Sequence, residues 1–493
     1  MNLVLPLLVL LARPQDQADL SDTIDTLLPG IVGYRFSPEA GLVDDGEFLR
    51  RAMLDLWGVP PTFDDVVAFT KDVRPGKRSE RVGTLLASPR FSNFWSRRIA
   101  EMFLGNFREA AGGTAFVRWL SDRLSEDRPW PDILRRMIEA EGSLSEVPEL
   151  AWKVAWWREK DEGSAFTTAL SRQVFGINLF CARCHDHAFD KWRTEDFHQL
   201  AAFTRGRMLR RTPSEILVEE AAFDPERHVY DPYERLGWGR FAKTSPRLFD
   251  APAPTAGRKL SHSLADAIPQ DAHTDRAFVN RVWAWLMGRG LVQPVDEFDL
   301  KNKPLSAPLL ASLEADFRKH GRSLKALIQG ICLSQGYRRR SDAPGEVRKI
   351  TFSQGVVRPL SFSQLLASIE VATIDKSASD GEEAYRRSGG VWGRPGVETE
   401  VTPLRLDART AEWLREDPKT REMIRTSPTL RRLAAGPGPM AGRIERLFLT
   451  VLSRPPTPDE LDRFGNFLGG DSAAEWEAAL WVLLNTTEFR TRH

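Results

Sequence analysis

Residues 51–65 read RAMLDLWGVPPTFDD, and residues 446–460 read RLFLTVLSRPPTPDE. Each stretch consists of an arginine, an apolar segment, a Pro-Pro-Thr step and an acidic residue three positions after the threonine. The proline pair ends one helix, because proline lacks the backbone N–H that a helix interior requires. The threonine and the acidic residue then form a capping box that begins the next helix. The two stretches therefore predict the same helix–ProProThr–helix element near both ends of the chain.

The likeness between the two stretches extends further along the chain. Residues 85–91 read LLASPRF and residues 483–489 read LLNTTEF, while residues 333–337, LSQGY, form a partial third copy of this ending. Two shared motifs in the same order indicate an internal duplication that builds scaffold rather than a site. Because clean strand-like alternation is scarce elsewhere, we predict a mainly α, multi-helical protein.

The composition of the chain suggests two helical domains and an exported protein. Residues 19–210 and 258–493 are the predicted domains, and residues 211–257 form an irregular linker that is rich in proline, glycine and aromatic side chains. The apolar run at 3–12 is too short to span a bilayer and is typical of a signal peptide, which we place at residues 1–18. No other run has transmembrane length, so we expect no integral membrane span.

The charge balance bears on the partners of the protein. Lysine and arginine number 69 against 68 aspartate and glutamate residues, so the net charge is +1. A nucleic-acid-binding protein would carry a basic surplus or stripe, and we therefore expect no nucleic-acid partner.

Side chains that can bind a metal or form a covalent bond are concentrated in residues 181–187, CARCHDH. The chain has only three cysteines and eight histidines, and two of each lie in these seven positions. Apolar residues recur before the motif at helical spacing, at Phe166, Leu170, Val174 and Ile177, which predicts a helix from about 165 to 180 that leads into Cys181. After the motif, Thr194 is the predicted cap of the next helix.

The spacing of the motif fits covalent attachment of c-type haem. In this interpretation Cys181 and Cys184 bind the two vinyl groups, and His185 is the axial ligand of the iron. The two cysteines are three positions apart and so lie about one turn apart, which brings both sulfurs to one edge of the porphyrin. Attachment of this haem takes place outside the cytoplasm, in agreement with the predicted export.

Two other interpretations of the motif remain open. Zinc or iron could be held by Cys181 and Cys184 together with two of the three imidazoles of His185, His187 and His198. Alternatively, the cysteines form a disulfide or a dithiol, and the histidines only pack.

These motifs together resemble a known family, the secreted proteins of planctomycete type that pair domain of unknown function 1549 with domain of unknown function 1553. The similar segments are FLRRAMLDLWGVPPT (48–62), VFGINLFCARCHDHAFDKW (174–192), FVNRVWAWLMGRGLVQPVDEF (278–298) and RPLSFSQLL (358–366). The resemblance implies export and, through the motif, haem binding, but it implies no reaction. The chain lacks the separate cytochrome c-like module of many family members, and Ser306 stands where the family tends to have a histidine.

Two functional classes follow from the sequence. The first is an exported redox or electron-transfer protein of the periplasm, which binds c-type haem or another metal and works with a periplasmic redox partner. The second is a helical scaffold or binding protein at the cell surface, in which the Cys-His cluster is a structural metal site.

Overall fold

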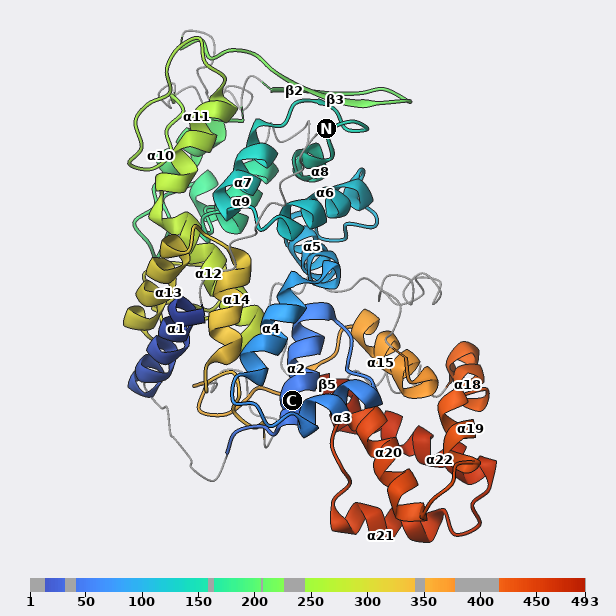
Figure 1. The fold of residues 1–493 in the computed structure, drawn as a ribbon. Helices are drawn as coiled ribbons and strands as arrows, with labels where there is room; N and C mark the ends of the chain where they lie inside the picture. The colour runs from blue at the N-terminus through green and yellow to red at the C-terminus, as the bar shows by residue number, and fades with distance from the viewer. Residues whose placement is uncertain are drawn as a thin grey trace, which may run out of the picture. The chain divides into compact units, whose positions relative to one another are not determined.

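The computed structural model describes residues 14–31, 41–157, 164–204, 207–225, 244–341, 351–376 and 416–492. The apolar run at 3–12, which carries the signal-peptide prediction, lies outside the described residues. Of the described residues, 60% are helical and 5% are in strands, which confirms the predicted mainly α fold (Figure 1).

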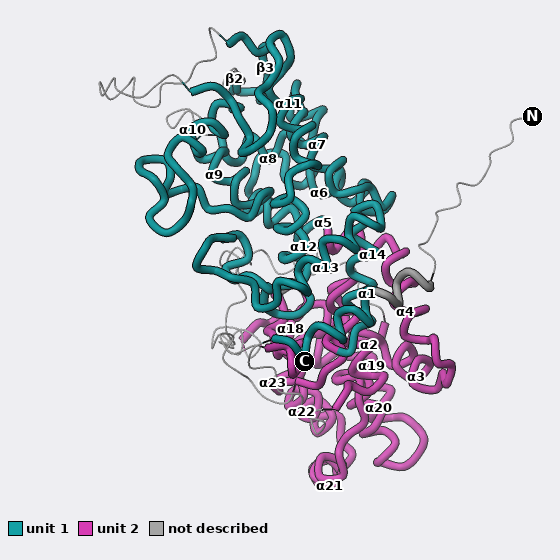
Figure 2. Tube along the Cα trace, turned by 90° about the vertical axis from the view of Figure 1, so that its left-hand side faces the viewer, with its two compact units in different colours: residues 1–34, 96–335 teal, residues 35–95, 336–493 magenta. Residues whose placement is uncertain are grey.

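The chain divides into two compact units, each assembled from two separate segments (Figure 2). Unit 1 comprises residues 1–34 and 96–335, and unit 2 comprises residues 35–95 and 336–493. The two units therefore do not correspond to two consecutive halves of the sequence. The domain boundaries at 210 and 258 remain a prediction.

Unit 1 consists mainly of helices that pack through large aromatic side chains. Its helices are the C-terminal part of α5 (Pro89–Leu104) and α1 (Pro14–Leu27), α6 (Gly113–Ser125), α7 (Trp130–Glu139), α8 (Ala151–Trp156), α9 (Ser164–Gln173), α10 (Thr194–Ala202), α11 (Leu260–Ala267), α12 (Ala272–Met287), α13 (Ala307–Lys319) and α14 (Leu324–Leu333). The buried ring of Trp152 lies between Phe103 and Phe166, with centroids 5.1 and 4.9 Å away. Such aromatic contacts supply much of the buried area between helices.

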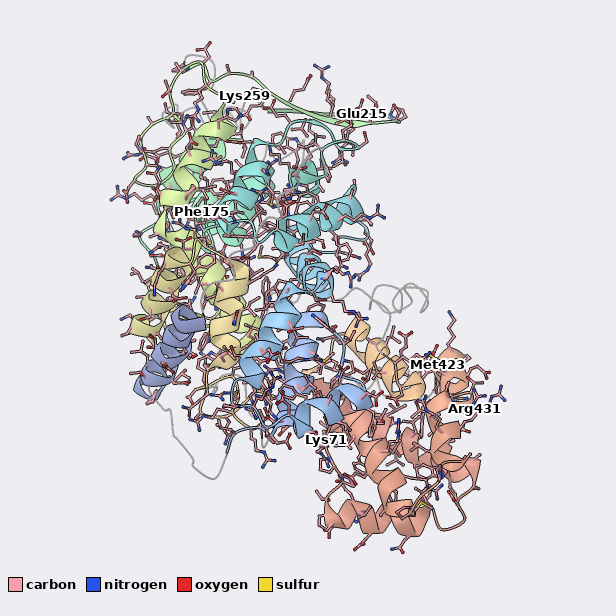
Figure 3. All side chains as sticks on the ribbon, viewed as in Figure 1. Lys71, Phe175, Glu215, Lys259, Met423 and Arg431 are labelled. Atoms are coloured by element: carbon pink, nitrogen blue, oxygen red, sulfur yellow. The ribbon has the colours of Figure 1, made fainter. Side chains whose placement is uncertain are left out.

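A small antiparallel sheet belongs to unit 1 and has the strand order β1-β3-β2. Its strands are β1 (Gly142–Ser143), β2 (Arg207–Arg211) and β3 (Ile216–Glu220), and β3 lies inside the segment 211–257 that was predicted as a linker. Glu215 lies at the tip of the β2–β3 hairpin (Figure 3). Glu220 at the end of β3 accepts the backbone N–H of Ser261 at 2.8 Å, which joins the sheet to the first turn of α11.

Unit 2 contains both copies of the repeated element. Its helices are α2 (Asp45–Trp57), α3 (Phe63–Lys71), α4 (Lys77–Ala87), α15 (Phe362–Ile374), α18 (Pro418–Arg425), α19 (Pro428–Ala434), α20 (Met440–Leu452), α21 (Pro458–Phe467), α22 (Ala473–Leu484) and α23 (Thr487–Arg490), and strands β4 (Arg358–Pro359) and β5 (Thr491–Arg492) pair antiparallel. The core of this unit gathers buried side chains from α15, α19, α20 and α22 around Trp476.

Both predicted capping boxes are present. The Thr62 hydroxyl accepts the backbone N–H of Asp65, and the Asp65 carboxylate accepts the backbone N–H of Thr62. Thr457 and Glu460 form the same reciprocal pair at the start of α21. The helix–ProProThr–helix element predicted from the sequence is therefore confirmed at α2–α3 and at α20–α21.

Candidate functional site

The segment that leads into the Cys-His motif ends its helix earlier than predicted. Helix α9 stops at Gln173, and residues 174–180 run without regular helix to the motif, so the predicted helix to residue 180 is wrong at its C-terminal end. The cause is Gly176, whose φ of +66° is the left-handed conformation that glycine adopts after a helix. A side chain at this position would also meet Ala277 and Phe298 at 2.9 Å.

The apolar side chains of this pattern are nevertheless all buried. Phe166, Leu170, Val174 and Ile177 are each at most 2% exposed. Because Val174 and Ile177 stay in the core after the helix has ended, the chain that follows is anchored where the motif begins.

The motif itself forms a single exposed turn. Residues Cys181–Arg183 are a 3-10 helix, and Cys184 closes it by donating its backbone N–H to the Cys181 carbonyl at 3.4 Å. Side chains three positions apart lie above one another in a 3-10 helix, so the two cysteines share one side of the turn. Both are free thiols and exposed, whereas Ala182 is fully buried and fixes the turn to the protein.

The three imidazoles around the turn differ in their hydrogen bonds. His185 is exposed, and its Nδ1 lies 2.8 Å from the Asp186 carbonyl oxygen. A carbonyl oxygen only accepts, so this Nδ1 carries the proton and the lone pair of neutral His185 is on Nε2. The exposed His185 therefore has the tautomer in which Nε2 carries the lone pair, and this nitrogen is suited to metal ligation.

The other two imidazoles carry the proton of the neutral ring on the opposite nitrogen, Nε2. The Nδ1 atom of His187 accepts the backbone N–H of Phe189 at 3.4 Å, which places the proton of the neutral ring on Nε2. The buried His198 directs its Nε2 to the Arg183 carbonyl at 3.1 Å and so donates from that atom. Both rings thus support the backbone of the loop, and His198 ties helix α10 to the turn of the motif.

Asp186 connects the motif to the next helix. Its carboxylate accepts the backbone N–H of Thr194 at 2.9 Å and the Thr194 hydroxyl at 3.2 Å. These hydrogen bonds lower the pKa of Asp186, and the bond from the Thr194 backbone N–H has the largest effect. The prediction that Thr194 caps α10 is wrong by one residue, because Thr194 is the first helical residue and Arg193 is the N-cap. The loop is closed by the backbone N–H of His187, which donates to the Trp192 carbonyl at 2.8 Å.

The surroundings of the motif contain exposed aromatic surface. Phe180 is 53% exposed and Phe189 is 58% exposed. The Arg183 guanidinium lies 5.3 Å from the centroid of the Phe180 ring, and the Lys301 ammonium covers the ring of Phe189. Among the described residues, no group of three or more His, Cys, Asp or Glu side chains is arranged so that it could hold a metal ion.

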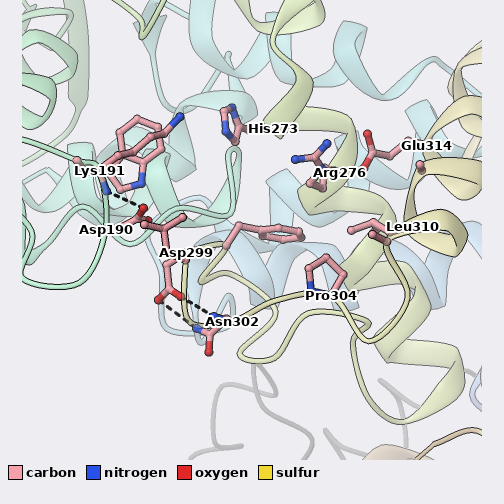
Figure 4. Close-up of a pocket in the computed structure, with 14 residues that line it drawn as sticks. Asp190, Lys191, His273, Arg276, Asp299, Asn302, Pro304, Leu310 and Glu314 are labelled. Carbon is pink, nitrogen blue, oxygen red and sulfur yellow. Dashed lines mark hydrogen bonds and ion pairs between the residues drawn. The ribbon is translucent and has the colours of Figure 1, made fainter. Parts of the chain in front are cut away.

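A pocket of about 370 Å³ lies on the same unit, next to the end of the motif loop (Figure 4). Lys191 and Trp192 line it from the loop, and His273 and Arg276 line it from the first turns of α12. Sequence reasoning did not identify these residues. The only available signal was the spacing of His273 and Arg276, which puts both on one face of a helix.

Other polar residues near this region have structural roles. The Asn280 side chain donates to the Val292 and Val295 carbonyls and accepts the Val292 N–H, which ties α12 to the chain that follows it. Ser306 accepts the backbone N–H of Leu309 at 3.3 Å and caps α13.

Comparison with known proteins identifies two family models in succession. Residues 33–207 match the model described as a protein of unknown function (DUF1549), and residues 259–388 match the model described as a protein of unknown function (DUF1553). No curated protein and no solved structure matches the chain. In the described part of the chain, none of the helices is both long and apolar enough to cross a membrane. The two matches cover more than half of the sequence in the order expected from its motifs, and the chain belongs to the family of proteins that pair a DUF1549 domain with a DUF1553 domain.

Proposed function

We propose that this protein is exported, binds c-type haem covalently at the CARCH turn, and functions in redox chemistry or electron transfer. The observation that carries the proposal is the arrangement of Cys181, Cys184 and His185 on one exposed turn. Two free thiols share one side of the 3-10 helix, and the imidazole beside them has Nδ1 bonded to a carbonyl. This pattern leaves Nε2 of His185 available to iron.

The residues of the turn fit the chemistry of attachment. Each thiol would add its S–H across one vinyl group and form a thioether, a reaction that needs no oxidant. The bound haem would supply reversible one-electron chemistry at its iron. Phe180 and Phe189 offer exposed apolar surface to a porphyrin face, and Arg183 is a cation near that surface.

The alternative zinc or iron site requires other changes in the loop. Ligation through Nε2 of His198 would break its hydrogen bond to the Arg183 carbonyl, and ligation through Nε2 of His187 would require the other tautomer. These costs favour haem, since attachment at Cys181, Cys184 and His185 keeps all of these bonds.

The decisive experiment is to produce the full chain in a periplasm with working haem-attachment machinery. We expect a Soret band and a haem stain that survives denaturing electrophoresis. Cys181→Ala combined with Cys184→Ala should abolish the stain, and His185→Ala should retain it but change the spectrum. Cys332→Ala is the matched control, because Cys332 is buried and remote in sequence from the motif, and it should keep both signals.

A different result would indicate a structural metal site in place of haem. A protein without a Soret band that contains about one equivalent of zinc or iron would contradict the haem proposal and support a structural metal. The double cysteine variant should then lose thermal stability, because a structural metal contributes directly to the free energy of folding.

Export is tested separately by sequencing the N-terminus of protein purified from its native host. We expect the mature chain to begin between about residues 13 and 20. Leu20, Ile24 and Leu28 are buried, so the mature chain must keep them to complete the packing of α1 in unit 1. An intact Met1 would contradict export.

A further inference from the structure

The pocket beside the motif loop has walls of contrasting chemistry. Figure 4 shows Lys191, His273 and Arg276 along one side and Asp299, Asn302 and Pro304 along the other. Its apolar lining includes Trp192, Phe298 and Leu310. A cavity of about 370 Å³ with an apolar body and a few polar groups is typical of a small-molecule site.

The cationic side of the pocket has unused donors. Arg276 donates from Nε to Glu314 at 2.8 Å, and neither of its terminal nitrogens has a hydrogen bond to a described residue. Glu314 is buried and also faces Arg318, which fixes the position of the Arg276 guanidinium. The Lys191 ammonium lies 4.7 Å from the Trp192 ring centroid and forms no ion pair with a described carboxylate.

The carboxylates of the pocket, in contrast, are already engaged. Asp299 accepts the backbone N–H groups of Lys301 and Asn302 at 2.7 Å and the Asn302 side-chain amide at 3.2 Å. Glu314 is held by the two arginines named above, and Asp190, the third carboxylate of the lining, accepts the backbone N–H of Lys191 at 2.7 Å. The pocket therefore offers hydrogen-bond donors and positive charge to a ligand, which favours an anion over a neutral polyol.

His273 adds an acceptor on the same side of the pocket as the two cations (Figure 4). Its Nδ1 lies 3.0 Å from a carboxylate oxygen of Asp271, the N-cap of α12, so Nδ1 carries the proton. The neutral ring then has its lone pair on Nε2, which can accept a hydrogen bond from a ligand hydroxyl. The ring is also fixed by Trp192 and Phe249, whose centroids lie 6.0 and 5.6 Å away.

From this arrangement we infer that the pocket binds a small organic carboxylate with an apolar body and a hydroxyl beside the carboxylate. Arg276 and Lys191 bind the carboxylate, His273 accepts from the hydroxyl, and Trp192 and Phe298 pack against the apolar body. The inference does not depend on haem, because none of these residues belongs to the proposed attachment turn.

The test is calorimetric titration of the full chain with phenylacetate, mandelate and benzyl alcohol. Phenylacetate is a small ligand of ten non-hydrogen atoms and should bind with a Kd of about 1 mM. Both enantiomers of mandelate are titrated, and one should bind more tightly than phenylacetate because it adds the hydroxyl. Benzyl alcohol lacks the carboxylate and should bind at least about tenfold more weakly than phenylacetate.

Variants separate the roles of the lining residues. Arg276→Gln should weaken phenylacetate binding about tenfold or more, and Lys191→Gln, on the exposed loop, should act in the same direction. His273→Phe keeps an aromatic ring and should remove only the preference for mandelate. Arg210→Gln is the matched control, since Arg210 is an exposed arginine paired with Glu219 at 3.4 Å outside the pocket, and it should bind like the parent chain.

The inference is overturned if neither acid binds saturably at about 10 mM, or if benzyl alcohol binds as well as phenylacetate. It is also overturned if Lys191→Gln and Arg276→Gln both bind phenylacetate like the control. Thermal melts of each variant identify any loss of binding that comes from unfolding. In that case Lys191→Gln decides the question, because Lys191 is exposed and does not contribute to the core.

Discussion

A single buried carboxylate, Asp55, connects distant parts of unit 2. It accepts the Tyr337 hydroxyl at 2.8 Å, Arg358 at 2.9 Å and Arg492 at 2.7 Å. The Asp55 side chain is 3% exposed and that of Arg492 is 5% exposed. The sequence could not reveal this cluster, because its members lie 282 to 437 positions from Asp55 and none follows a local pattern.

We expect Asp55→Asn to lower the free energy of unfolding by about 3–5 kcal/mol, because it leaves buried arginines without their counter-charge. Tyr337→Phe removes one hydrogen bond from the same carboxylate and should cost only about 1–3 kcal/mol. The measurement is urea unfolding of both variants and the parent. A cost below about 1 kcal/mol for Asp55→Asn would show that the cluster contributes little to stability.

At the scale of elements, the sequence predicted both ProProThr capping boxes but not the end of α9. Both ProProThr capping boxes depend on residues three positions apart, so they could be identified without knowledge of the fold. The end of α9 could not, because Gly176 adopts its left-handed conformation where Ala277 and Phe298 approach it. The same limit applies to the candidate site, where the sequence identified the motif but not the tautomers, which depend on backbone carbonyls.

The two copies of the repeat approach each other closely at Gly46. A Cβ atom at Gly46 in α2 would lie 2.2 Å from the carbonyl oxygen of Ser453, the residue that ends α20. We expect Gly46→Ala to destabilise the protein by about 1–3 kcal/mol, since backbone must move to admit the methyl group.

The matched control is Gly83→Ala in α4, where a Cβ atom would meet nothing within 4 Å. Alanine is the better helix former, so this variant should be more stable than the parent by about 0.5–1 kcal/mol. Urea unfolding compares the two. Equal effects at both positions would contradict the proposed contact between the copies.

The pH dependence of stability has a specific source in the second copy. Arg454 donates to Glu460 and lowers the pKa of this carboxyl to about 2 in the folded chain. A folded pKa below that of the unfolded chain stabilises the fold above about pH 4.5, and this stability is lost as pH falls through about 2. Thermal melts at pH 5 and pH 3 should therefore show a smaller acid-induced decrease for Arg454→Gln than for the parent.

The control for this measurement is Arg425→Gln. Arg425 pairs with Glu422 on the surface, and both side chains are more than half exposed, so its loss should leave the acid-induced decrease unchanged. If Arg454→Gln behaves like this control, Glu460 does not govern the acid sensitivity of the fold.

At the scale of the whole molecule, each compact unit combines two segments that are far apart in the sequence. The helices α2, α3 and α4, close to the N-terminus, belong to the same unit as the helices at the C-terminus. Composition along the chain detects changes in local character, such as the irregular stretch at 211–257, but contains no signal for a contact between residues 55 and 492. The repeat was the one indirect hint, since duplicated elements commonly pack on each other.

This organisation predicts how fragments of the chain will fold. A chain of residues 258–493 alone lacks α2, α3 and α4 of unit 2 and should show no cooperative unfolding in urea. A chain that joins residues 35–95 to 336–493 should unfold cooperatively, because it contains the whole of unit 2.

The join is physically feasible because Trp95 at one end and Tyr337 next to the other end both contact Asp55. The Trp95 indole donates to the Asp55 carbonyl at 3.2 Å, and the Tyr337 hydroxyl donates to the Asp55 carboxylate at 2.8 Å. A Gly/Ser linker of about 10 residues, with a mean span of about 17 Å, can connect Trp95 to Gly336. Introducing Asp55→Asn into the joined chain should lower its stability as in the full chain, which distinguishes the native fold from a collapsed state. Cooperative unfolding of 258–493 without cooperative unfolding of the joined chain would instead establish the consecutive domain boundaries.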